Sequence, residues 1–223
     1  MRILALADIH GYPRGEATVR KLAHQTSPDI IAIAGDLTGQ TGIGSTRELL
    51  AALPVPTMVV PGNIDGRTAV ASFTTGKARN IDLDRAVFGE FTFIGIGGIS
   101  VPAAEGRGAA GELSAIEEKL SGLAGPKTVI LTHIPPLGRL DSVPVPAPFA
   151  SGRGETEHIG SHFIRRAVER LRPVLVISGH VHEHRGIERD GTTLYVNPGP
   201  AQDGFGAVVE MDRRPSARLL ETS

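Results

Sequence analysis

At residues 173–182 the chain reads PVLVISGHVH, an unbroken apolar run followed by a glycine and two histidines. An apolar run that stops at a glycine is typical of a β-strand buried on both faces. If the chain stays extended beyond the strand, His180 and His182 point to the same side, because side chains alternate along extended backbone. Two neutral imidazoles that converge can bind a metal ion. Histidines at this spacing can equally be solvated loop residues, so other segments must decide.

The same arrangement, a buried strand followed by polar side chains, occurs at four other places. The expected strands cover 3–7, 29–34, 57–60 and 127–131, and they are followed by Asp8-Ile9-His10, Gly35-Asp36, Gly62-Asn63 and Thr132-His133. Helices expected at 15–25 and 45–53 separate the first three strands. Alternating strands and helices predict a parallel α/β sheet, in which ligands bind beyond the carboxyl ends of the strands.

The remaining segments predict a second, β-rich part. A short helix is expected at 66–73, and further helices are expected at 112–120 and from Ser161 to about Arg170. The expected strands are a hairpin at 85–88 and 91–96, a meander through 185–188 and 194–196, and a final pair of strands at 205–211 and 217–220. Residues 134–159 are rich in proline and glycine. A connection of that length inside a compact domain is usually functional or disordered.

Composition limits the possible classes of protein. The 223 residues are 40% hydrophobic and 21% charged, with a formal net charge of −1, which is ordinary for one globular domain, taken here as 1–223. No basic block favours nucleic acid as a bulk partner. No apolar run reaches the length of a membrane span, and the first one stops at Asp8, too early for a signal peptide. We therefore expect a cytoplasmic protein with no membrane partner, and leave its oligomeric state open.

The donors that follow the strands are all oxygen or nitrogen. The chain has no cysteine, so thiolate ligands are excluded. The candidate ligands are two carboxylates, one amide and four imidazoles: Asp8, His10, Asp36, Asn63, His133, His180 and His182. Seven such donors suit two metal ions that share a carboxylate, which is the usual arrangement for phosphoester hydrolysis.

These motifs, in the order D-x-H, G-D, G-N-x-D, T-H and G-H-x-H from Asp8 to His182, resemble those of the calcineurin-like metallophosphoesterases. The resemblance implies an α/β fold, a four-layer α/β/β/α sandwich of two mixed sheets. Residues 135–138, 158–161 and 197–199 are similar to a small prokaryotic branch of the family.

The resemblance also implies a ligand set and a reaction. One ion would be held by Asp8, His10, Asp36 and His182, and the other by Asp36, Asn63, His133 and His180, with Asp36 bridging. A hydroxide bridging the ions would attack a small phosphate ester, with Asn63 and His133 close to the reaction. The cofactors would be two divalent metal ions; we expect manganese, with iron, zinc, nickel or cobalt as alternatives.

The chain departs from the family pattern at Ile64, where many members carry a histidine that protonates the leaving group. Isoleucine cannot donate a proton, so we expect phosphodiesters or activated phosphate esters as substrates and name His158 as the candidate replacement acid. Asp65 is then expected to be the N-cap of the next helix. The alternatives are a phosphomonoesterase acting on proteins or nucleotides, and a non-catalytic metal- or phosphate-binding protein.

Several arginines in or near loops could also face a phosphate, although each alone is more typical of a solvated surface charge. They are Arg14, Arg67, Arg107, Arg139 and Arg153.

Overall fold

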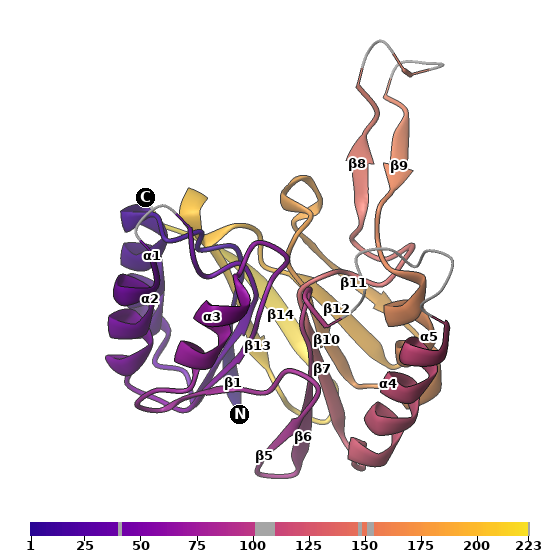
Figure 1. Ribbon diagram of the computed structural model, residues 1–223, viewed down its shortest axis with the longest axis horizontal. Coiled ribbons are helices and arrows are strands. Elements are labelled where there is room, and N and C mark those ends of the chain that lie inside the picture. The colour runs from indigo at the N-terminus through magenta and orange to yellow at the C-terminus, as the bar shows by residue number, and fades with distance from the viewer. Residues whose placement is uncertain (40–41, 101–109, 147–148, 151–153, 223) are drawn as a thin grey trace.

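The computed structural model describes residues 1–39, 42–100, 110–146, 149–150 and 154–222. Within them, two six-stranded sheets face each other and helices cover their outer faces (Figure 1). This is the four-layer α/β/β/α sandwich that the sequence resemblance implied. Arg107 and Arg153 lie outside the described residues.

The first sheet has a parallel core and an antiparallel edge. Its order is β14 (Ser216–Glu221), β13 (Phe205–Glu210), β1 (Arg2–Leu6), β2 (Ile30–Ala34), β3 (Thr57–Val60) and β4 (Ala78–Asn80). Strands β1 to β4 run parallel, while β13 is antiparallel to β1 and to β14. The final pair of strands was predicted, but β4 was not, because three residues with one buried side chain carry little pattern.

The second sheet is also mixed. Its order is β11 (Gly186–Asp190), β12 (Thr193–Asn197), β10 (Leu175–Ile177), β7 (Thr128–Thr132), β6 (Phe91–Ile96) and β5 (Arg85–Phe88). The expected meander is wrong, because β12 runs parallel to β10 and lies between β10 and β11. Burial explains the order: all five residues of β12 are buried, whereas β11 is partly exposed and takes the edge.

Helices pack on the outside of each sheet. The first sheet is covered by α1 (Pro13–Thr26), α2 (Gly42–Ala51), α3 (Arg67–Val70) and the 3₁₀ turn η1 (Ala71–Phe73), and the second by α4 (Ala110–Leu123) and α5 (His162–Leu171). As predicted, Ser161 caps α5 by accepting a hydrogen bond from the Ile164 backbone N–H. Among the described residues no helix is both long and apolar enough to span a bilayer.

Alternation along the strands explains why their sequences are apolar throughout. Ile3 and Ala5 of β1 join the cluster between the two sheets, while Leu4 and Leu6 join the cluster beneath α1 and α2. Each strand therefore buries both faces. A third cluster, which includes Ile130 of β7, lies between the second sheet and its helices.

The sheets approach each other closely where their carboxyl ends meet. A Cβ added at Gly179 would lie 2.6 Å from the Cβ of Ala7 and 3.1 Å from the carbonyl oxygen of Ala34. Glycine at 179, facing the small side chain of Ala7, is thus required for this contact. Because the sheets touch here, the loops that follow their strands share one region.

The long connection at 134–159 contains a feature that the sequence did not predict. Strands β8 (Ser142–Pro144) and β9 (Thr156–His158) pair in an antiparallel hairpin that projects from the body of the molecule (Figure 1). Its exposed strands lack the alternation of buried side chains that normally reveals a strand.

Candidate metal centre

Loops from both sheets bring the candidate ligands together. Asp8 follows β1, Asp36 follows β2, Asn63 follows β3, His133 follows β7 and His180 follows β10. Backbone hydrogen bonds connect these loops: the Asp8 N–H donates to the carbonyl of Gly35, and the Gly179 N–H donates to the carbonyl of His133 (both 3.0 Å). The carboxyl ends of the strands thus form one edge, as expected for a ligand site in an α/β protein.

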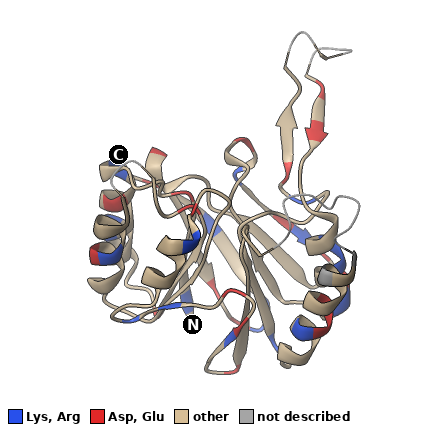
Figure 2. Ribbon diagram, in the orientation of Figure 1, with Lys and Arg blue, Asp and Glu red and all other residues tan. Residues whose placement is uncertain are grey.

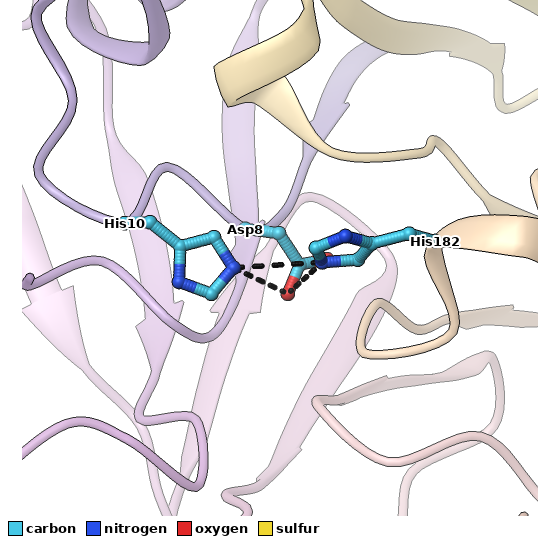
Figure 3. Close-up of side chains that lie close together, drawn as sticks. All are labelled: Asp8, His10 and His182. Carbon is cyan, nitrogen blue, oxygen red and sulfur yellow. Dashed lines mark hydrogen bonds and ion pairs between the residues drawn. The ribbon is translucent and has the colours of Figure 1, made fainter.

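A first group of potential ligands consists of Asp8, His10 and His182 (Figure 3). The two Nε2 atoms lie 3.5 Å apart, and Asp8 Oδ1 lies 3.9 Å from His10 Nε2 and 3.6 Å from His182 Nε2. Asp8 is almost fully buried, and its Oδ1 has no hydrogen-bond partner among the described residues. An unpartnered buried carboxylate oxygen is costly. A divalent cation among these three atoms would compensate it, so the residues fit a metal ion.

A second group consists of Asp8, Asp36 and His133. His133 is completely buried, and its Nε2 lies 3.5 Å from Asp36 Oδ2 and 2.8 Å from Asn63 Oδ1. Its Nδ1 donates to the carbonyl of Ala34 at 2.8 Å. This hydrogen bond fixes the ring so that Nε2 points at the carboxylate and the amide oxygen, as in metal-ligating histidines.

His180 lies beside the second group and follows β10, a neighbour of β7 in the second sheet. Its ring centroid lies 5.0 Å from that of His133, and its backbone N–H donates to Asp8 Oδ2 at 3.1 Å. The structure thus brings together all seven residues named from the sequence. Asp8 is the residue common to both groups, whereas the resemblance assigns the bridge to Asp36; which carboxylate bridges two ions stays a prediction.

In the metal-free protein, a proton on His133 lies where a metal ion would bind the second group. Burial acts to lower the pKa of His133, but its hydrogen bond with Asp36 and the charges of Asp36 and Asp8 raise it to about 9. Burial would raise the pKa of Asp36, yet the hydrogen bond and charge of His133 and the Ile64 N–H hold it below its ordinary value. At neutral pH the metal-free protein therefore holds His133 as an imidazolium, whose Nε2–H satisfies Asp36 and Asn63.

The pKa values of His180 and His182 shift in opposite directions. Burial and the charge of His133 lower the pKa of His180. The side-chain contact with Asp8 raises the pKa of His182 despite burial. Metal ions bind the neutral imidazole, so the proton on His133 competes with them.

The backbone of the site is strained. Four of the candidate ligands have φ in the left-handed region: Asp8 (55°), His10 (54°), Asp36 (51°) and His180 (68°). Non-glycine residues seldom occupy this region, and such conformations cost about 1–3 kcal/mol each and concentrate at functional sites. The turn at each of these residues redirects the chain after a straight strand and holds the side chain in the site.

The chain does not stay extended from 180 to 182, so the condition for His180 and His182 to point to the same side is not met. His180 turns into the left-handed region, and His182 begins the 3₁₀ turn η2 (His182–His184). The two imidazoles separate, His182 to the first group and His180 towards His133. Buried Asn197 supports the turn, since its Nδ2 donates to the carbonyl of Val181 at 2.8 Å.

Asp65 has a different role from the expected helix cap. Gly66 is the N-cap of α3, while Asp65 is buried and accepts hydrogen bonds from the backbone N–H groups of Leu37, Thr38 and Gly62 and from the hydroxyl of Thr38. It thereby joins the loop of Asp36 to the loop of Asn63. Close packing of these loops leaves no room at Gly62, where an added Cβ would lie 1.9 Å from Asp36 Oδ1.

His158, the candidate acid, belongs to neither group of ligands. It lies on β9 with an exposed side chain, and its Nδ1 lies 2.6 Å from Oδ1 of Asp141. Asp141 is completely buried, and its Oδ2 accepts hydrogen bonds from the N–H groups of Gly138 and Gly160. Sequence reasoning missed this carboxylate, because an aspartate in a proline-rich loop is usually a turn residue.

A cavity of about 550 Å³ opens beside the first group and is lined by His10 and His182. Ile64 lies in its wall with half of its surface exposed, next to Tyr12 and Gln202. A substrate that reaches the first group thus meets Ile64, which offers it no proton.

Two mixed sheets with carboxylates and imidazoles at their meeting edge define a metallophosphoesterase. The model of the calcineurin-like phosphoesterase family matches residues 1–184, and the chain belongs to that family.

The chain is similar to proteins from archaea, bacteria and animals. The uncharacterized protein MJ1162 of Methanocaldococcus jannaschii is 28% identical over 207 residues, which cover 90% of this chain and 88% of that protein. Human metallophosphoesterase domain-containing protein 1 is 39% identical over 70 residues, 31% of this chain and 19% of that protein. The crystal structure of TT1561 from Thermus thermophilus has the same fold, with a TM-score of 0.70 at 19% identity over 99% of this chain and 98% of that one.

Metal binding should release protons and strengthen as the pH rises. Because His133 has a pKa of about 9 in the metal-free protein, its proton must leave before Nε2 can bind an ion. We expect the affinity for Mn²⁺ to increase by about tenfold per pH unit for each proton displaced between about pH 6.5 and 8.5. Calorimetry in two buffers of different ionisation enthalpy measures the protons released. An affinity independent of pH would contradict the assignment.

Asp65→Asn should weaken metal binding without touching a ligand. The amide cannot accept all the hydrogen bonds that hold the Asp36 and Asn63 loops together, and loss of such support typically costs about 10–100-fold in metal affinity. Asp29→Asn is the matched control, because Asp29 accepts the Arg2 N–H far from the site. Equal Mn²⁺ affinities of the two folded variants would argue against a positioning role for Asp65.

Proposed function

We propose that this protein is a dinuclear metal-dependent phosphoesterase that hydrolyses phosphodiesters or activated phosphate esters of small molecules. The observation that carries the proposal is the buried carboxylate of Asp8, shared by two groups of potential metal ligands from opposite sheets. Membership of the calcineurin-like phosphoesterase family supports the reaction class. We expect manganese as the ion, and the cytoplasmic location stays a prediction.

The residues of the site suit this reaction. When bound, two divalent ions would neutralise the phosphoryl oxygens and lower the pKa of the attacking water. Asp8 and Asp36 supply negative charge, while neutral imidazoles and the Asn63 amide leave the ions electrophilic. Close contact between the sheets, with Asp8 and His133 fully buried, keeps bulk water from the floor of the site.

The preference for diesters or activated esters rests on Ile64. This side chain lies in the cavity wall beside His10 and His182, where it cannot protonate a departing alkoxide. An activated leaving group, such as a phenolate, needs no such proton. Ordinary phosphomonoesters, which expel an alkoxide that needs a proton, are placed second.

His158 is the residue that we propose as the acid for poorer leaving groups. Buried Asp141 contacts Nδ1 and orients the exposed ring, so that Nε2 is the nitrogen we propose as the proton donor. His158 pairs with Ser142 across the hairpin, and the Ser142 hydroxyl lies 2.8 Å from Nδ1 of His184 in the turn that carries His182. The hairpin is thus tied to a candidate metal-ligand turn through these contacts.

The Mn²⁺-loaded protein should hydrolyse bis(p-nitrophenyl) phosphate faster than p-nitrophenyl phosphate. The two substrates share a leaving group, so their rates compare diester with monoester directly. Asp8→Asn should abolish both activities by removing the shared carboxylate. A faster monoester would favour the phosphomonoesterase alternative, and no turnover despite two bound ions would favour a non-catalytic metal- or phosphate-binding protein.

His158→Gln should slow the hydrolysis of esters with basic leaving groups more than that of esters with weakly basic ones. On an alkyl aryl phosphodiester that expels a phenolate the rate should change little, whereas on a dialkyl phosphodiester it should fall by about 10²–10⁴-fold, the usual contribution of a general acid. The control is His162→Gln, since His162 is an exposed histidine at the start of α5. If dialkyl ester hydrolysis persists unchanged in His158→Gln, another group supplies the proton.

A further inference from the structure

A second cavity, of about 480 Å³, lies between α3 and α4, and we call it the α3–α4 cavity. These helices belong to opposite outer layers (Figure 1). The cavity lies beside the segments that follow β3, β4 and β6, which contribute Pro61, Asp82 and Ile99. Its described lining residues include none of the seven candidate metal ligands.

The charge of this lining is positive. Arg67 of α3 and Lys119 of α4 both line the cavity, and Asp82 is the acidic residue among its described lining residues. Basic side chains from separate elements on one cavity suit an anion, and guanidinium pairs well with planar or tetrahedral oxyanions. Figure 2 shows basic residues on both helices.

The carboxylate of Asp82 is engaged by the protein itself. One oxygen accepts the Gly97 N–H at 2.7 Å and the other accepts the Ser100 hydroxyl. Burial raises the pKa of Asp82. The hydrogen bonds and the charge of Lys119, which also acts on Asp84, partly satisfy this carboxylate. An anion in the cavity would therefore share Lys119 with these carboxylates and depend most on Arg67.

The rest of the lining is largely apolar. Val70, Leu83, Ile99 and Ile116 contribute aliphatic surface beside the two cations. A bare inorganic anion would leave this surface in contact with water. An anion that carries an apolar body would cover it and gain from burial.

We propose that the α3–α4 cavity binds a small organic anion whose charged group contacts Arg67 and Lys119 and whose apolar body packs against Val70 and Ile116. The site is distinct from the metal centre, although the Gly98 N–H donates to the carbonyl of Pro61 at 2.8 Å between them. This inference does not rest on the proposed hydrolase activity.

The test uses the full-length, Mn²⁺-loaded protein and 1-naphthalenesulfonate, whose sulfonate is a poor ligand for divalent ions. Binding is followed by the fluorescence of the probe or by calorimetry. We expect saturable binding that exceeds that of methanesulfonate, which lacks the apolar body, and of 1-naphthalenemethanol, which lacks the charge. Equal binding of the charged and neutral naphthalenes, or no binding, would overturn the proposal.

Variants locate the probe. Arg67→Ala and Lys119→Ala should each weaken binding by about tenfold, the effect of removing one charged hydrogen bond. Arg79→Ala is the matched control, because Arg79 pairs with Asp84 and does not line the cavity. Asp8→Asn should bind the probe as the unmodified protein does. Loss of binding in Asp8→Asn, or unchanged binding in both cation variants, would place the probe elsewhere and refute the assignment.

Discussion

The contact between the two sheets at their carboxyl ends is the constraint on which the site depends. Gly179 packs against Ala7 and Ala34, so a loop of the second sheet reaches the first sheet without an intervening side chain. The same contact buries Asp8 and aligns its carboxylate with histidines that are distant in the chain. A larger residue at Gly179 or Ala7 would separate the sheets and, with them, the two halves of the candidate metal centre.

This arrangement costs free energy in the metal-free protein. Four candidate ligands adopt left-handed backbone conformations, and one oxygen of Asp8 has no partner among the described residues. The apolar layers on both faces of each sheet supply the stability that holds such a site in place. The imidazolium of His133 reduces the electrostatic cost by placing a proton between Asp36 and Asn63. A metal ion would compensate Oδ1 of Asp8, so we expect metal binding to stabilise the folded protein.

At position 64 and in the proline-rich connection, the local chemistry of the chain departs from the family pattern. Ile64 leaves an aliphatic wall where a proton donor is common in the family, and the exposed His158 is held by buried Asp141 on a projecting hairpin. Asp65, which follows Ile64, accepts hydrogen bonds from the loop of Asp36 and from the loop of Asn63 and so joins them. These positions are where the chain differs in its local chemistry while its layers and ligand loops keep the common plan.

The sequence by itself determined most of the strands and helices and the seven candidate ligands, because buried strands are unbroken apolar runs and the polar residues after them interrupt those runs abruptly. It also determined the fold class, since strands alternate with helices in the first third of the chain. Only the tertiary structure decided that β12 lies between β10 and β11 and that β8 and β9 form a hairpin. It also decided that His180 and His182 diverge and that Asp65 and Asp141 are buried hydrogen-bond acceptors. These features depend on contacts between residues far apart in the chain, and such contacts leave no periodic pattern in the local sequence.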